Sequence, residues 1–351
     1  MSDALVYPFA ERPAYGAVMP VAPGIYWLRM PVPIPGLESI NLWVLEDGPG
    51  LTLVDTGVAT AEVTALWEQV IAEHFGGRPV TRVLCTHFHP DHLGQAGWLT
   101  RRFGVDLWMT LGEWSFGRML SLESETDVPD EVLGFYRRIG FDAAAIERYR
   151  VRGFDSFRRA VSEIPRSLRR IADGETIAIG DHAWQVIVGQ GHSPEHAALY
   201  CAELNLLISG DQVLPRISPH IGVYPGEPEA DPLSLYLTSL DRFRPLPAQT
   251  LVLPSHNEPF HGLHARLDAL AQHHHKRLSD LFQACATPRT ALDVLPVLFH
   301  RKLDEKNTYF AVSEGIAHLH RLMVEGRLLR ELGADGVYRY RQSCTQAASA
   351  A

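Results

Sequence analysis

The chain has 351 residues, 46% of them hydrophobic, and a formal net charge of −9. This composition is enough for one large core with a smaller one, or for two domains, and the acidic balance excludes a general polyanion-binding protein. The first residues include acids and a proline, so we expect no signal peptide, and no run approaches the roughly 18 apolar residues of a membrane helix.

The four cysteines, Cys85, Cys201, Cys285 and Cys344, are widely scattered and form no CxxC pair. Such spacing predicts reduced thiols without a disulfide framework. We therefore expect a cytoplasmic protein.

The first part of the chain predicts strands that alternate with helices. Apolar runs rich in β-branched and aromatic residues, separated by Gly and Pro turns, predict strands. An amphipathic pattern that opens near a threonine and closes on two glycines predicts a helix. The predicted order is strands 24–32, 40–47 and 51–57, helix 60–77, strand 80–85, helix 93–104 and strand 105–110. Residues 113–172 differ, with a helical pattern, aromatics and many arginines.

Strands return after this helical region, at 175–190, 196–203, 204–214 and 249–256. Three helices follow, at 262–286, 288–299 and 313–332, and then a DG turn with a short alternating strand at 333–341. Helices that end in a turn and a strand are typical of a winged helix-turn-helix module. This module binds nucleic acid or serves packing and dimerisation, so a homodimer stays open. Its charge is only slightly positive, so we do not expect nucleic-acid binding. The run His273–His275 predicts a solvated helix face.

Four ligand-type side chains crowd the turn between strand 80–85 and helix 93–104. They are His87, His89, Asp91 and His92. Histidine nitrogen and carboxylate oxygen are the ligands of zinc and its first-row neighbours. His87 and His89 are two residues apart on an extended segment and can share one ion. Asp91 and His92 lie where the helix begins and can face a second ion.

Three further candidates, His192, Asp211 and His256, each end an apolar strand. Loops at one edge of a sheet converge, so side chains at strand ends can meet. The alternative, a polar loop that is merely rich in histidine, does not explain these three placements. The sequence therefore predicts a metal site.

This constellation resembles the metallo-β-lactamase superfamily over about residues 20–262. The motifs that carry the resemblance are "LVDTG", "THFHPDH", "GHSPEH", "SGDQ" and "PSH", in the order of the family. The double-histidine turn is similar to that of the glyoxalase II and acyl-homoserine lactonase branch. The C-terminal tail is similar to the winged-helix extension of the lactamase-like protein 2 group. The resemblance implies an α/β, four-layer αββα fold. It divides the chain into a catalytic domain at 1–262, with a helical lid at about 113–172, and a helical, winged-helix domain at 263–345.

The resemblance also implies a ligand set for two divalent ions, with zinc as first choice and iron or manganese as alternatives. One ion takes His87, His89 and His192, the other takes Asp91, His92 and His256, and Asp211 bridges both. A bridging hydroxide would attack a substrate carbonyl, with Asp91 and Asp211 as catalytic residues. Asp91 would also orient the attacking proton or carry it to the leaving group. We expect Asp55 and His196 behind the ligands, and Cys85 as a small buried residue.

The expected substrate is a small molecule with a thioester, ester or lactone bond. The segment after Asp211 does not match the basic and aromatic run with which the glyoxalase branch holds glutathione. Trp114 and Tyr136 could line an apolar acyl pocket, and an acyl-CoA-like thioester would also use the arginines of the lid, Arg148, Arg150 and Arg152. Alternatively, these arginines are solvated surface. Two other functions stay open, a phosphodiesterase or ribonuclease, and a non-hydrolytic binding protein on the same fold.

Overall fold

The computed structural model describes residues 5–34, 37–123, 127–153, 155–300 and 303–343. The chain forms two compact units. The first comprises Met1–Ser124, Asp155–Pro219 and Asp241–Leu267, and the second comprises Glu125–Phe154, His220–Leu240 and Asp268–Ala351. The expected domain boundary after residue 262 lies close to the last residue of the first unit, but two earlier segments join the second. The assignment of a function to each domain stays a prediction.

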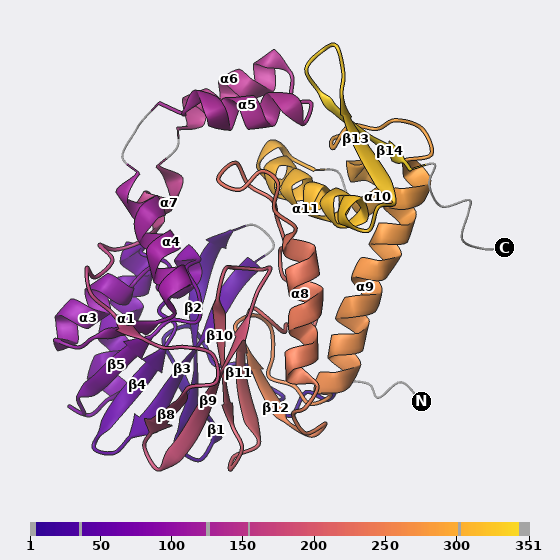
Figure 1. The fold of residues 1–351 in the computed structure, drawn as a ribbon. Coiled ribbons are helices and arrows are strands. Elements are labelled where there is room, and N and C mark those ends of the chain that lie inside the picture. The colour runs from indigo at the N-terminus through magenta and orange to yellow at the C-terminus, as the bar shows by residue number, and fades with distance from the viewer. Residues whose placement is uncertain (1–4, 35–36, 124–126, 154, 301–302, 344–351) are drawn as a thin grey trace. The chain divides into compact units, whose positions relative to one another are not determined.

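A seven-stranded sheet forms the N-terminal part of the first unit (Figure 1). Its strands follow chain order from β1 to β7, antiparallel up to β4 and parallel from there on. The strands are β1 (Val18–Ala22), β2 (Ile25–Ile34), β3 (Leu37–Asp47), β4 (Gly50–Val54), β5 (Val80–Leu84), β6 (Leu107–Met109) and β7 (Arg169–Arg170).

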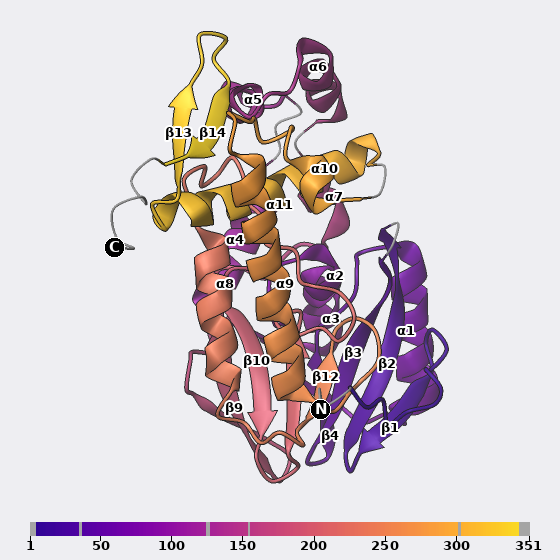
Figure 2. The ribbon, with the colours of Figure 1, turned by 90° about the vertical axis from the view of Figure 1, so that its right-hand side faces the viewer.

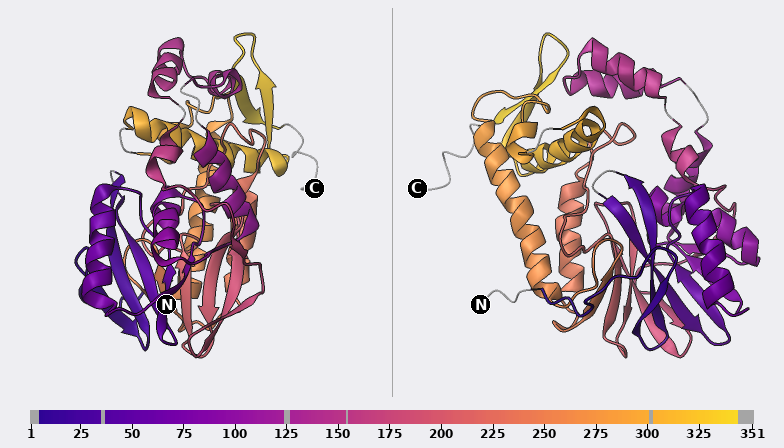
Figure 3. Two further views of the ribbon diagram at one scale, coloured as in Figure 1. Left: turned by 90° about the vertical axis from the view of Figure 1, so that its left-hand side faces the viewer. Right: turned by 180° about the vertical axis from the view of Figure 1, so that it is seen from behind.

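Helices α1 (Ala61–His74) and α3 (Ala96–Phe103) bury one face of this sheet. Helix α1 begins at Thr60, whose hydroxyl accepts a hydrogen bond from the Val63 N–H and so satisfies a free donor of the first turn. Trp67 of α1 is fully buried in the same cluster as Leu42 of β3. Figure 3 shows α1 lying along the outer face of the sheet.

A second, five-stranded sheet has the order β12-β11-β10-β9-β8. Its strands are β8 (Thr176–Ile179), β9 (His182–Gly189), β10 (His196–Cys201), β11 (Leu206–Gly210) and β12 (Leu251–Pro254). The strand predicted at 175–190 is two strands, because Gly180, at φ 58°, turns the chain back between them. The inner faces of the two sheets share a core in which Trp27, Trp43 and Trp184 are fully buried.

Asn41 of β3 joins the first sheet to the end of the second. Its Oδ1 accepts a hydrogen bond from Trp27 Nε1 at 2.8 Å. Its Nδ2 donates to the carbonyl oxygens of Pro254 at 2.8 Å and Asn257 at 2.7 Å, which flank His256. Asn41 is buried, so each of these groups depends on it rather than on water.

Residues 113–172, predicted as one helical lid, contribute helices to both units. Helices α4 (Leu111–Leu122) and α7 (Ser156–Ala160) belong to the first unit. Helices α5 (Asp130–Arg138) and α6 (Ala143–Arg152) belong to the second. The Asp142 carboxylate caps α6 by accepting the Ala145 N–H at 2.7 Å.

The second unit also contains α8 (Pro232–Leu240), α10 (Leu295–Leu298), α11 (Glu305–Val324) and most of α9 (Leu263–Ala284). The prediction of a helix over 313–332 was wrong at its end: α11 stops at Val324, next to Glu325 and Gly326 at φ 69°. Leu328–Leu332 instead form strand β13, which pairs antiparallel with β14 (Tyr338–Gln342), the hairpin of Figure 2. Of the predicted helix 288–299, only α10 forms.

The prediction of a solvated face at His273–His275 was wrong for its middle residue. His274 is fully buried, and its Nδ1 lies 3.1 Å from Nε2 of His318 on α11. His318 Nδ1 donates to the Glu314 carbonyl at 2.8 Å, so its Nε2 is the acceptor for His274. Burial lowers the pKa of His274 to about 2 and that of His318 to about 3, so both rings are neutral at pH 7.

Cys85, Cys201 and Cys285 are buried and free, and Cys344 lies outside the described residues. In the described part of the chain, no helix is long and apolar enough to cross a membrane.

We predict that Asn41→Leu destabilises the first unit. The change leaves the Trp27 N–H and two carbonyls without their partner, at roughly 1–3 kcal/mol for each buried group. All seven tryptophans lie in the first unit, so their fluorescence during urea unfolding reports on it. The control is Gln69→Leu, the same kind of change at an exposed position of α1. If the two variants lose equal stability, Asn41 does not hold the sheets together.

Candidate metal centre

The seven predicted ligands come from loops that follow four strands of the first unit. His87 and His89 follow β5, and Pro90 starts the short helix α2 (Pro90–Leu93), which carries Asp91 and His92. Proline suits the first position of a helix, where its missing N–H is not needed. The remaining ligands follow strands of the second sheet: His192 after β9, Asp211 after β11 and His256 after β12. The structure thus brings all seven together at one edge of the two sheets.

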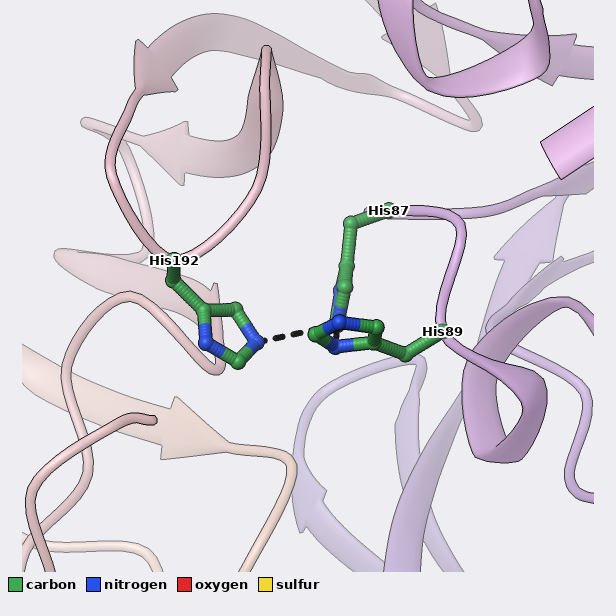
Figure 4. Close-up of side chains that lie close together, drawn as sticks. All are labelled: His87, His89 and His192. Carbon is green, nitrogen blue, oxygen red and sulfur yellow. Dashed lines mark hydrogen bonds between the residues drawn. The ribbon is translucent and has the colours of Figure 1, made fainter. Parts of the chain in front are cut away.

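Three histidines form the first ligand group, shown in Figure 4. His87 Nε2 lies 2.9 Å from His89 Nδ1 and 3.2 Å from His192 Nε2. A tetrahedral zinc with bonds of 2.0–2.1 Å to nitrogen has ligand atoms roughly 3.3 Å apart. The spacing of these nitrogens therefore fits one ion.

Asp91, His92 and His256 form a second group. His256 Nε2 lies 3.3 Å from Asp91 Oδ2, and His92 Nε2 lies 3.7 Å from the same oxygen. Asp211 faces both groups. Its Oδ2 is 3.5 Å from His192 Nε2, whereas its Oδ1 is 3.4 Å from His256 Nε2 and 3.6 Å from His92 Nε2.

Unpaired buried atoms test whether this cluster fits a cation. Within the described residues, His92 Nε2, His256 Nε2 and Asp211 Oδ1 are buried without a hydrogen-bond partner. The Nδ1 atom of His92 lies 2.8 Å from an Asp55 oxygen, and that of His256 lies 2.8 Å from the Ser39 carbonyl oxygen. Because these partners accept, each Nδ1 carries a proton, and Nε2 is the ring atom that faces the cluster and can bind a metal. Buried polar atoms that converge without hydrogen-bond partners are costly unless a cation joins them, so the residues fit divalent metal ions.

Asp55 holds the ligand turn from behind, as the sequence predicted. Its carboxylate accepts hydrogen bonds from the Thr86 N–H at 2.8 Å and from the Thr86 hydroxyl. The same carboxylate accepts the His92 Nδ1–H, which orients that ring and makes its Nε2 a better ligand. Asp55 itself lies at φ 62°, an uncommon conformation for a residue with a side chain.

The surroundings of His196 and Cys85 agree with the predicted supporting roles. His196 Nε2 accepts the backbone N–H of Asp211 at 3.0 Å, so this nitrogen is not available to a metal. Cys85 is fully buried, and burial raises the pKa of its thiol well above the usual value.

Opposite charges compete with burial in setting the protonation of the ligands. Burial raises the pKa of Asp91, but His92 and His256 outweigh this effect and bring it to about 2. Burial lowers the pKa of His256, but Asp211 and Asp91 raise it to about 10 in the absence of a metal, so a bound cation would replace the proton on its Nε2. Burial and the neighbouring histidines both lower the pKa of His87. Burial raises the pKa of Asp211 as well, but His256 and His92 outweigh it and lower that pKa, so both carboxylates are ionised at neutral pH and attract cations.

Glu113 is a buried carboxylate beside the centre that the sequence analysis missed. It lies in the first turn of α4 and accepts hydrogen bonds from the Ser193 hydroxyl and from the backbone N–H groups of Phe88 and Glu195. Burial raises the pKa of Glu113 to about 7, although these hydrogen bonds lower it. Its position after the apolar run 105–110 was the available signal, because that run is a strand and strand ends collect site residues.

Trp114 and Tyr136, the predicted acyl-pocket residues, lie in different units. Trp114 Nε1 donates to the Pro165 carbonyl at 3.0 Å, and the ring is half-buried against the helical side of the first sheet. Tyr136 is buried in the second unit, with its ring 4.5 Å from Tyr149 and 5.4 Å from Tyr309. The structure places Tyr136 as a core side chain of that unit.

The three predicted substrate arginines lie on the surface of the second unit. Arg148, Arg150 and Arg152 are exposed on α6. Arg150 Nε lies 3.7 Å from a Glu147 oxygen, and the Arg152 guanidinium lies 6.0 Å from the Tyr309 ring centre. Exposed contacts of this kind contribute little to stability, so those of Arg150 and Arg152 add little to the fold. Their role in substrate binding stays a prediction.

A cavity of about 150 Å³ lies next to the second ligand group. Its lining includes the metal-ligand candidate His256, its neighbour Asn257, and the charged side chains of Arg12, Arg29 and Glu38. A small molecule in this cavity would lie beside the cluster.

Comparisons with known proteins agree with this geometry. Residues 35–256 match the metallo-beta-lactamase superfamily, and residues 278–343 match the metallo-beta-lactamase-like C-terminal domain. The chain is 43% identical to a beta-lactamase domain protein from Burkholderia ambifaria, with a TM-score of 0.89 over 97% of this chain and 98% of that one. It is 30% identical to a metallo-beta-lactamase family protein from Thermus thermophilus, with a TM-score of 0.77 over 92% and 100%.

A probable metallo-hydrolase of Bacillus subtilis, YqjP, is 28% identical over 89% of this chain and 96% of its own length. These similarities extend over the ligand motifs and the C-terminal segment alike. The chain belongs to the metallo-β-lactamase superfamily, with the αβ fold of that family, a C-terminal domain and clusters of histidine and aspartate that can bind metal ions.

Proposed function

We propose that this protein hydrolyses a thioester, carboxylic ester or lactone with two divalent metal ions, zinc first among them, with iron and manganese as alternatives. The observation that carries the proposal is the position of Asp211. Its two oxygens face different ligand groups, Oδ2 toward His192 and Oδ1 toward His256. A carboxylate in this position can bridge two ions, and an intact set of seven ligands is more than a binding scaffold needs.

Two bound dications would lower the pKa of a water molecule and polarise a substrate carbonyl. The residues of the chain prepare the site for this chemistry. Asp91 is ionised at neutral pH, so its carboxylate can accept a proton from the attacking water and pass it to the leaving group. Ser39 and Asp55 fix the rings of His256 and His92 through their Nδ1 atoms, which limits reorganisation during the reaction.

An anionic acyl thioester, such as an acyl-CoA-like compound, is the substrate class we favour. Arg148, Arg150 and Arg152 on α6 present three exposed guanidinium groups that could bind phosphates. Trp114 in the first unit remains the proposed acyl contact. In the second unit, helix α11 followed by the hairpin β13–β14 supports a winged-helix arrangement, for which we propose a packing role.

A hydrolysis screen with metal analysis on the same sample tests the proposal. We expect about two ions per chain in protein purified without added metal, and turnover of thioesters, esters or lactones. Chelation should abolish this turnover, and added metal should restore it. Turnover of phosphodiesters or RNA instead would establish the alternative function, and metal content near zero that zinc, manganese or iron does not restore would contradict the dinuclear site.

We predict that Asp211→Ala costs more activity than His256→Ala. The Asp211 carboxylate faces both ligand groups, whereas His256 faces only the second. The additional loss in kcat/KM should be at least about tenfold, or 1.4 kcal/mol of transition-state stabilisation. Metal content of both variants is measured alongside. Equal losses at equal metal content would mean that Asp211 does not bridge.

We predict that replacing Arg148, Arg150 and Arg152 together by alanine raises KM for an acyl-CoA far more than KM for a small neutral ester. Three charge-assisted contacts at about 1.5 kcal/mol each would, if additive, exceed a thousandfold in KM. Turnover should change less, because such contacts bind ground and transition states alike.

The matched control replaces Arg101, Arg102 and Arg170, three exposed arginines of the first unit, and removes the same total charge. Circular dichroism checks that both triple variants fold. If the two variants change KM for the acyl-CoA equally, the loss of positive charge anywhere on the surface, and not the arginines of α6, would explain the effect.

A further inference from the structure

The buried carboxylate of Glu113 connects the two loops that carry the first ligand group. Its Oε1 accepts the Ser193 hydroxyl and the Glu195 N–H, both at 2.6 Å. Its Oε2 accepts the Phe88 N–H at 2.9 Å. Phe88 stands between His87 and His89, and Ser193 follows His192. Each histidine of the first ligand group is therefore the sequence neighbour of a residue that donates a hydrogen bond to Glu113.

A reciprocal contact secures the same loop on α4. The Glu195 carboxylate accepts the Gly112 N–H at 2.7 Å, at the N-terminus of α4 where the helix dipole favours an anion. The Thr110 hydroxyl donates to the Glu195 carbonyl at 2.9 Å. A Cβ at position 112 would lie 2.9 Å from the Glu195 carboxylate, so a larger residue there would shift this carboxylate.

This arrangement is specific to the first ligand group. The partners found for the second group are different ones: His92 is held by Asp55, and His256 by the Ser39 carbonyl. Glu113 is fully buried, and its hydrogen-bond partners are all donors, so its carboxylate serves only as an acceptor there. A side chain that merely filled space at this position would not need two acceptor oxygens.

We propose that Glu113 is a positioning residue that fixes the spacing of His87, His89 and His192 and thereby sets the affinity of the first metal ion. Glutamine has the same shape but only one acceptor oxygen, so it cannot satisfy donors at both carboxylate positions. One of the two loops is then released. Supporting residues of metal ligands typically change metal affinity 10- to 100-fold when they are lost. The inference rests on metal binding by the cluster and not on the substrate.

The test measures zinc affinity by chelator competition in two single-site backgrounds. His256→Ala removes a ligand of the second group and leaves the first ion, whereas His192→Ala leaves the second. Adding Glu113→Gln should weaken zinc at least tenfold in the first background and less than threefold in the second. Glu68→Gln, the same change at an exposed position of α1, should alter neither affinity.

Ser193→Ala provides a milder second variant, because it removes one of the three hydrogen bonds and keeps the carboxylate. It should weaken the first ion by less than Glu113→Gln does and leave the second unchanged. A spectroscopic readout accompanies it: the visible bands of bound cobalt(II) should shift in the His256→Ala background when Ser193 or Glu113 is changed.

Three outcomes would overturn the proposal. If Glu113→Gln and Ser193→Ala lower the melting temperature but leave both zinc affinities within threefold, Glu113 has only a structural role. If the zinc affinities of the two ligand groups fall equally, the effect of Glu113 is not specific to the first group. If Glu113→Gln does not fold, an unchanged first-ion affinity in Ser193→Ala overturns the proposal by itself. None of these measurements uses a substrate, so they succeed or fail independently of the hydrolase proposal.

Discussion

Buried polar atoms that face one another without hydrogen-bond partners are the constraint on which the site depends. The buried Oδ1 atom of Asp211 lies 3.4 Å from His256 Nε2 and 3.6 Å from His92 Nε2. None of these three atoms has a hydrogen-bond partner among the described residues. Polar groups buried in this way destabilise a fold unless a cation joins them. The contacts of the two rings also favour a metal. Asp55 accepts the Nδ1–H of His92 and the Ser39 carbonyl accepts that of His256, so the Nε2 atoms are the ones that can bind a metal.

The ligand set could be predicted because its signals are local. His87, His89, Asp91 and His92 fall within six residues, and His192, Asp211 and His256 each follow an apolar strand, where loops converge. Asn41 could not be predicted in this way, and the only signal for Glu113 was its place after the apolar run 105–110. Each acts through partners distant in the sequence, so no local pattern shows which groups it holds.

The second unit shows where sequence patterns are weaker. The leucines of 328–332 continue a helical spacing, yet Gly326 ends α11 and these residues pair with β14 as a strand. His274 belongs to a histidine run between exposed neighbours, but its place on the inward face of α9 buries it against His318. The arginines of α6 are exposed, and their place on the surface does not by itself indicate a function, so an experiment with substrate has to decide it.

Anomalous diffraction at the absorption edge of the bound metal tests the central claim most directly. The account predicts two peaks, roughly 3.5–4 Å apart, one beside His87, His89 and His192 and the other beside Asp91, His92 and His256, with Asp211 next to both. A single peak, or peaks away from these seven residues, in crystals grown with excess metal would contradict the dinuclear centre.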